Sequence, residues 1–160
     1  MEIGPLKQSQ IETIELMARN EETLASLYNI YAKKFPEHEF FWSDLSKDET
    51  SHANWIRLFL EKFKQGEITY NKNRFKKEAI KTFTEYLEKN IGKAKSGEIN
   101  IIGALSIALD IEKALIEKDF FEIMEKDSES MQQTFASLES ATKIHRDKVA
   151  SLIDSLKNSS

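Results

Sequence analysis

The sequence predicts an all-α protein, a four-helix bundle with one long crossover connection that carries a short extra helix. Three observations favour this fold. The 160 residues include only five glycines and two prolines, the residues that most often interrupt a helix. Long stretches between them have apolar residues at positions i, i+3, i+4 and i+7, as one face of a helix requires. No segment sustains a two-residue alternation, so we expect no β-sheet.

Length and composition exclude several classes of protein. A chain of 160 residues predicts a single domain over residues 1–160. The absence of cysteine excludes disulfides, thiolate zinc sites, iron–sulfur clusters and a cysteine nucleophile. The net charge is −4 with no basic block, so we expect no nucleic-acid partner. The sequence shows no signal peptide and no apolar run long enough for a membrane span, and the expected compartment is the cytoplasm.

The first two helices are predicted over residues 9–34 and 37–64. Ser9 followed by Glu12 has the spacing of a capping box, in which the hydroxyl and the carboxylate each bind a free amide at the helix start. Pro36 favours the second start, because proline at the first helical position costs no hydrogen bond. The short joint between these helices predicts antiparallel neighbours.

A long connection follows the second helix. Residues 65–73 are predicted to form a loop, since their sequence, QGEITYNKN, lacks helical periodicity. A shorter helix is expected at about 74–91, and Gly92 is expected to end it. This connection, about 30 residues long with its helix, is the crossover of the predicted bundle.

The last two long helices are predicted over residues 98–126 and 128–156. Gly103 falls inside the first of them, within an apolar pattern that continues past it. Asp127 or Ser128 can cap the second. The short joint again predicts an antiparallel pair.

Each long helix carries a polar interruption of its apolar stripe near mid-length. Burying a lone carboxylate is costly, and the usual remedies are a partner, a metal ion or a proton. Four interruptions at a matching depth suggest one shared site. They are Glu21 on the first helix, Glu49 and His52 on the second, Glu112 on the third, and Thr142 and His145 on the fourth.

The second and fourth helices also repeat one pattern with identical spacing. One contains Leu45-x3-Glu49-x2-His52, and the other contains Leu138-x3-Thr142-x2-His145. The chain therefore looks like two helix pairs related by a pseudo-two-fold axis. Glu and His at i, i+3 lie on one helix face. Oxygen and imidazole ligands with open positions suit iron or manganese, and zinc is also possible.

At these residues the sequence resembles the rubrerythrin and ferritin-like family. The resemblance covers most of residues 10–157. The segments that carry it are Glu21-x6-Tyr28-x2-Tyr31, Leu45-Ser-Lys-Asp-Glu49-Thr-Ser-His52, Ala104-Leu-Ser-Ile-Ala-Leu-Asp-Ile-Glu112 and Lys143-Ile-His145-Arg-Asp-Lys.

The resemblance implies a ferritin-like fold and a non-haem centre with two iron ions, or manganese or zinc in their place. The implied metal ligands are Glu21, Glu49, His52, Glu112 and His145. Tyr28 would donate a hydrogen bond to a ligand carboxylate or have a redox role. The implied activity is that of an oxidoreductase, either reaction with peroxide or dioxygen or oxidation of ferrous iron. The family also suggests a homodimer. A full rubrerythrin relays electrons through a cysteine-ligated iron domain, so this chain would need a separate electron-donor protein.

Two positions depart from the family pattern. Thr142 stands where the family has a glutamate, although Glu139 one turn earlier could reach in. With three glutamates facing two divalent ions, the second ion's site should be weaker. Asp119 stands where the family often has a tyrosine. Two alternatives therefore stay open: a metal-free bundle that acts as an interaction or assembly module, and a single-metal site on Glu21, Glu49, His52 and Glu112.

The aromatic residues near these positions also allow two interpretations. Tyr28 and Tyr31 have the spacing of packing aromatics as well as that of the family motif. Trp42 and Trp55 on the second helix can pack between helices or form a dimer interface. His38, in the first turn of that helix, is expected to be solvated.

Overall fold

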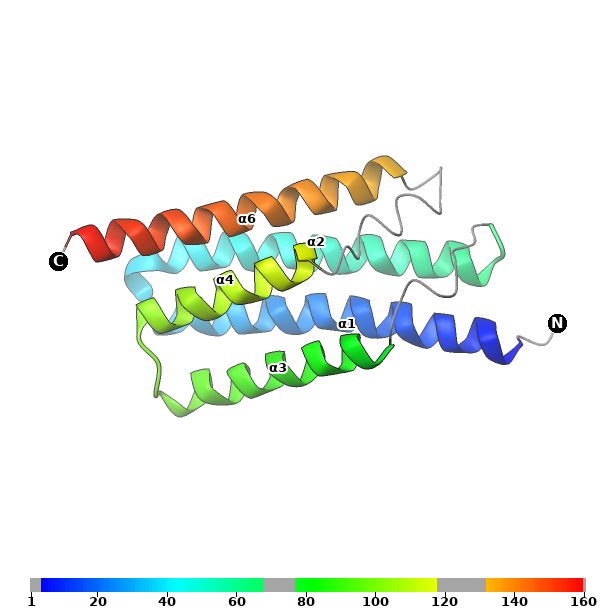
Figure 1. Ribbon diagram of the computed structural model, residues 1–160, viewed down its shortest axis with the longest axis horizontal. Coiled ribbons are helices and arrows are strands. Elements are labelled where there is room, and N and C mark those ends of the chain that lie inside the picture. The colour runs from blue at the N-terminus through cyan, green and yellow to red at the C-terminus, as the bar shows by residue number, and fades with distance from the viewer. Residues whose placement is uncertain (1–3, 68–76, 118–131, 160) are drawn as a thin grey trace. The chain divides into compact units, whose positions relative to one another are not determined.

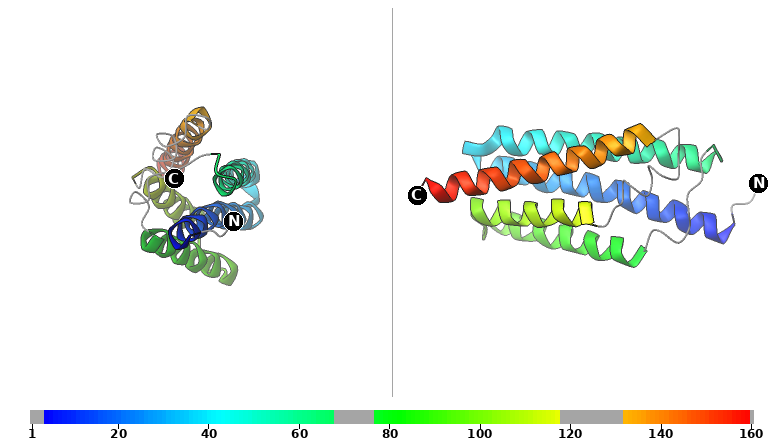
Figure 2. Two further views of the ribbon diagram at one scale, coloured as in Figure 1. Left: turned by 90° about the vertical axis from the view of Figure 1, so that its right-hand side faces the viewer. Right: turned by 45° about the horizontal axis from the view of Figure 1, so that its top comes forward.

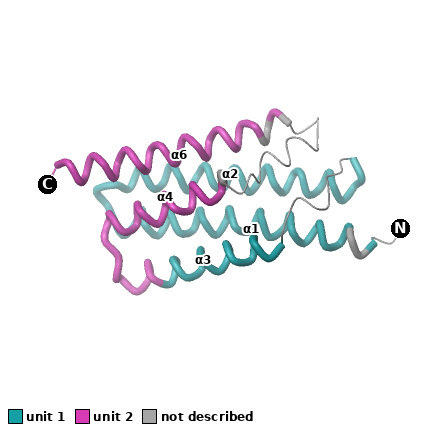
Figure 3. Tube along the Cα trace, viewed as in Figure 1, with its two compact units in different colours: residues 1–92 teal, residues 93–160 magenta. Residues whose placement is uncertain are grey.

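A computed structural model describes residues 4–67, 77–117 and 132–159, and every regular element among them is helical. This confirms the predicted all-α class. The chain divides into two compact units, Met1–Gly92 and Lys93–Ser160 (Figure 3). Each unit is built around an antiparallel pair of long helices. None of the described helices combines the length and the hydropathy that crossing a bilayer requires.

The first unit is a helical hairpin of α1 (Pro5–Lys34) and α2 (Glu39–Lys64). A single 3₁₀ turn, η1 (Pro36–His38), joins them, and the two helices run antiparallel side by side (Figure 1). Pro36 begins the 3₁₀ turn because its fixed φ suits a helical start and it needs no amide hydrogen bond.

The predicted capping box of the first helix is wrong. Helix α1 begins four residues earlier, with Gly4 as N-cap and Pro5 at the first position. Ser9 lies within the helix, where its carbonyl accepts a hydrogen bond of 2.9 Å from the Thr13 hydroxyl. Glu12 forms an ion pair with Lys77 at 2.7 Å instead of closing a box. The proline start was the stronger signal, since it leaves no amide unsatisfied.

Helix α3 (Lys77–Ser96) runs alongside α1, which lies between α2 and α3 in the end-on view of Figure 2. Asn20 of α1 accepts a hydrogen bond of 2.6 Å from the Thr84 hydroxyl of α3. The predicted end at Gly92 is wrong, because the helix continues through it. The stop is Gly97, whose φ of 84° is the left-handed conformation that commonly follows a helix.

Aromatic side chains pack the hairpin near its turn. The Trp42 ring lies 4.8 Å from the Tyr31 ring, edge to face, and 5.5 Å from the Tyr28 ring, measured between centroids. All three residues are fully buried. Such ring contacts stabilise the fold in addition to the stabilisation from burying the large apolar area of each ring. Trp42 is therefore a packing residue, whereas Trp55 on the same helix is 44% exposed.

The second unit contains the antiparallel pair α4 (Ile101–Glu117) and α6 (Gln132–Asn158) (Figure 1). Helix α4 begins three residues later than predicted, because the Asn100 side chain caps it by accepting a 2.8 Å hydrogen bond from the Gly103 amide. The predicted end at residue 126, the caps Asp127 and Ser128, and Asp119 lie outside the described residues. The buried faces of the pair include Leu105, Ala108, Ile111, Leu115, Leu138, Val149 and Ile153.

Candidate metal centre

Three of the predicted ligands meet inside the first unit. Glu21 projects from α1, and Glu49 and His52 project from α2 one turn apart. The His52 Nδ1 atom lies 3.1 Å from Glu49 Oε2 and 3.9 Å from Glu21 Oε2. One ligand atom from each residue lies within 4.8 Å of the other two. We refer to these three residues as the Glu21 group.

The Glu21 group is inside the hydrophobic core. Each of its side chains is at most 5% exposed. The neighbouring positions on the same helix faces are apolar and buried, among them Leu24 on α1 and Ile56 on α2. Because the surroundings offer little solvation, two carboxylates at this separation repel each other strongly when both are ionised. A cation held between them would remove that cost.

An ordinary hydrogen-bonded pair accounts for only part of this group. A buried histidine normally has a hydrogen-bond partner, and the Glu49 carboxylate, 3.1 Å from the His52 ring nitrogen, provides one. Such a pair does not need a second buried carboxylate, yet the structure brings Glu21 to 3.9 Å from the same ring nitrogen. Two carboxylates and one imidazole converging from two helices form a set of ligands that suits a divalent transition metal.

Two further predicted ligands meet inside the second unit. Glu112 of α4 and His145 of α6 are at most 1% exposed, and the His145 Nδ1 atom lies 3.7 Å from Glu112 Oε1. We refer to these two residues as the Glu112 group. Each unit thus pairs a glutamate of its first long helix with a histidine of its second, as the internal repeat predicts.

Thr142 occupies the position that corresponds to Glu49. It is 1% exposed, and its hydroxyl donates a 2.9 Å hydrogen bond to the Leu138 carbonyl of its own helix. Glu139, the possible substitute, does not take over this role. Its carboxylate is ion-paired with Lys143 at 3.5 Å, and its side chain is 23% exposed.

The structure places Tyr28 among the packing aromatics, against Trp42. Its redox role stays a prediction. The sequence does not indicate two buried donors, the Tyr31 hydroxyl and the Trp42 indole nitrogen. Neither makes a hydrogen bond within the described residues. Burial raises the pKa of Tyr31 well above its ordinary value, so the phenol stays protonated at neutral pH. No sequence pattern distinguishes such donors from ordinary aromatic packing.

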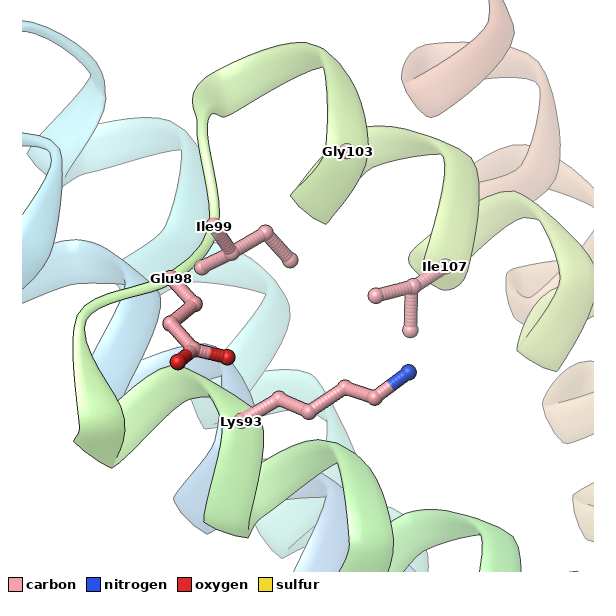
Figure 4. Close-up of a pocket in the computed structure, with 5 residues that line it drawn as sticks. All are labelled: Lys93, Glu98, Ile99, Gly103 and Ile107. Atoms are coloured by element: carbon pink, nitrogen blue, oxygen red, sulfur yellow. The ribbon is translucent and has the colours of Figure 1, made fainter.

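A separate cavity of about 410 Å³ opens in the second unit, between the end of α3 and the start of α4 (Figure 4). Lys93, Glu98, Ile99 and Ile107 line it together with Gly103. A Cβ atom on Gly103 would lie 3.1 Å from Ile99 Cγ1, closer than ordinary van der Waals contact, so the Ile99 side chain would have to shift slightly to admit it. None of the lining residues belongs to the Glu21 group or the Glu112 group.

The chain matches no protein-family model, no curated protein and no solved structure. The resemblance to the rubrerythrins therefore depends on the quoted residues alone, and the candidate centre depends on its own geometry.

Proposed function

We propose that this chain is a non-haem transition-metal protein of the rubrerythrin or ferritin-like type, and that iron is its metal. The observation that carries the proposal is the Glu21 group. Two carboxylates and an imidazole, all buried, lie within 4.8 Å of one another. Buried charges in proteins are normally paired or bound to metal. One histidine can neutralise the charge of at most one of the two carboxylates, whereas a divalent cation neutralises both.

The ligand types narrow the choice of metal. Carboxylate oxygens with one imidazole nitrogen suit iron(II), manganese(II) or zinc(II). Thiolate-dependent copper and zinc sites are excluded because the chain has no cysteine. Iron is proposed because the motifs resemble those of the rubrerythrins. A bound iron would supply reaction with peroxide or dioxygen, or would itself be oxidised from the ferrous form.

The side chains would perform separate tasks at such a centre. Glu21 and Glu49 would hold the ion and neutralise its charge, and His52 would provide the nitrogen ligand. Apolar neighbours such as Leu24 and Ile56 would limit the access of water. Exclusion of water strengthens the electrostatic interactions inside the site and protects reactive species from side reactions.

The finer architecture also belongs to this proposal. The matched spacing on the second and fourth long helices favours a ferritin-like four-helix bundle in which the Glu112 group supplies the other half of a two-ion centre. We further propose a cytoplasmic homodimer that receives electrons from a separate protein. Trp55, exposed on α2, is the tryptophan available for self-association, since Trp42 is buried.

Anaerobic loading with ferrous iron tests the proposal. The protein is desalted after loading, its iron is measured by elemental analysis, and peroxide is then added while ferric absorption is followed. We expect at least one iron per chain and rapid oxidation. His52→Ala should lose the bound iron, whereas His38→Ala, a histidine outside both groups, should keep it. An iron content well below one per chain in the wild type would refute the proposal.

A metal-free interaction module is the second candidate, and the Thr142 hydrogen bond to the Leu138 carbonyl favours it. A threonine satisfied within its own helix needs no metal. This candidate predicts that Glu49→Ala changes stability without changing metal content. The same elemental analysis decides between the two functions.

A further inference from the structure

We propose that Ser46 and Arg57 are positioning residues that hold α1 and α2 in the register that assembles the Glu21 group. Both residues belong to α2 and neither is a member of the group. One precedes the group along α2 and the other follows it, so their contacts with α1 lie on either side of the ligands. This inference rests on the proposed function, because the affinity for metal is the property that the register would change.

The turn at Pro36 sets the register where α1 and α2 meet, but the Glu21 group lies far from that turn. About four turns of helix separate Glu21 from Pro36. The buried faces over this length are mostly apolar. Apolar side chains at successive turns can exchange neighbours when one helix slides past the other. Hydrogen bonds are directional, so each of them is satisfied in a single register.

Ser46 binds α2 directly to the backbone of α1. Its hydroxyl donates a 2.8 Å hydrogen bond to the Ala25 carbonyl. Ser46 lies about one turn before Glu49, and Ala25 lies about one turn after Glu21, so this bond joins the two helices about one turn from the ligands. The Ser26 hydroxyl, by contrast, bonds to a carbonyl of its own helix. The bond from Ser46 would break if one helix moved along the other.

Arg57 holds α1 on the other side of the group. Its Nη1 atom donates to both carboxylate oxygens of Glu15, at 2.9 and 3.0 Å, and its Nη2 atom donates to Glu22. These carboxylates lie about two turns apart on α1, and Glu22 is the residue next to Glu21. Because the guanidinium is planar and presents its donors in fixed directions, it can reach both carboxylates in one register only. All three side chains are partly exposed, so these ion pairs add little to overall stability.

A fixed register would raise the affinity of the Glu21 group for metal. Its three ligand atoms lie within 4.8 Å of one another in the register that the structure shows. A slide of one helical turn, about 5.4 Å, would carry Glu21 away from the other two ligands. A site that is assembled in only a fraction of the molecules has an apparent dissociation constant raised in proportion. Loss of one hydrogen bond that favours the assembled register should therefore weaken metal binding about two- to tenfold.

A cobalt(II) titration of the full chain, followed by the visible absorption of the bound ion, tests the role of Ser46. Ser46→Ala should raise the cobalt dissociation constant about two- to tenfold. Ser46→Thr keeps the hydroxyl and should bind cobalt as tightly as the wild type. Ser26→Ala is the matched control, because the Ser26 hydroxyl bonds only within α1, to the Glu22 carbonyl. The control should leave the dissociation constant unchanged.

Two variants of Arg57 test the second contact independently. Arg57→Met removes both ion pairs and should raise the cobalt dissociation constant about two- to fivefold. Arg57→Lys keeps the charge but cannot reach both carboxylates, so its dissociation constant should lie between those of the wild type and Arg57→Met.

Urea titrations of the metal-free variants separate positioning from a merely structural role. Ser46→Ala and Arg57→Met proteins that lose stability but bind cobalt as tightly as the wild type would overturn the inference. The proposed function fails in a different way. A wild-type protein that binds no cobalt, iron or zinc would have no metal centre, whereas equal binding by the wild type and all variants would leave the centre and remove only the positioning role.

Discussion

Substitution of Glu49 by glutamine should affect the metal-free and metal-loaded proteins in opposite directions. The ligand atoms of the Glu21 group lie within 4.8 Å of one another. At an effective dielectric constant of about 20, two unit charges at that separation repel by about 3 kcal/mol. Because the His52 ring beside both carboxylates offsets part of this repulsion, we expect the net cost to be about 1–3 kcal/mol. Glu49→Gln removes one charge and keeps the shape.

The metal-free variant should therefore unfold at a higher temperature than the metal-free wild type. A gain of this size corresponds to a rise of about 2–12 °C, at about 2–4 °C per kcal/mol for a chain of this length. Metal at about 100 times its dissociation constant should add about 2.7 kcal/mol to the wild type, or about 5–10 °C, and much less to the variant.

Thermal unfolding followed by circular dichroism, with and without manganese(II), measures both effects. Glu61→Gln is the matched control, because Glu61 lies on the same helix and its side chain is 61% exposed. That control should behave like the wild type in both conditions. A metal-free Glu49→Gln protein that is less stable than the wild type, or one that metal stabilises as strongly, would refute the reasoning.

Three further predictions concern the scaffold of the first unit. Trp42→Ala should lower the free energy of unfolding by about 3–5 kcal/mol in a urea titration, since it leaves a cavity in the aromatic core. Asn20→Ala should cost about 1–3 kcal/mol in the same assay, because it removes a buried contact with Thr84. The hydrogen bond from the Lys77 ammonium lowers the pKa of the Glu12 carboxyl. This pair should therefore add stability above the ordinary titration range of a carboxyl and lose it as pH falls through the lowered pKa. Carbon-detected NMR should show the pKa of Glu12 rise toward its usual value in Lys77→Met, with the hydrogen bond from Gln8 still lowering it.

Local signals predicted the helical class and the joint between the first two helices, but they placed several helix ends wrongly. The pair Ser9 and Glu12 imitates a capping box although Pro5 already starts the helix. Gly92 was predicted to be a stop. A glycine inside a helix costs only about 1 kcal/mol, and continued burial of Ala94 on the same helix compensates for such a loss. Only Gly97 adopts the left-handed conformation that ends α3.

The candidate centre was partly predictable for a geometric reason. The spacing of Glu49 and His52 places both on one helix face from sequence alone. Their approach to Glu21 depends on the register of the α1–α2 hairpin, which the turn at Pro36 sets, since Glu21 lies about as far before that turn as the pair lies after it. The sequence could not show that Glu139 would form an ion pair with Lys143. Tertiary structure decides whether its carboxylate lies in an ion pair near the surface or in a buried site.

The most direct test of the metal centre is the position of a bound ion. A crystal of the protein soaked with zinc(II) should give an anomalous difference peak at the zinc edge inside the first unit. That peak should lie about 2.0–2.2 Å from carboxylate oxygens of Glu21 and Glu49 and from a ring nitrogen of His52. Zinc bound only at surface carboxylates, with no peak among these three side chains, would contradict the account.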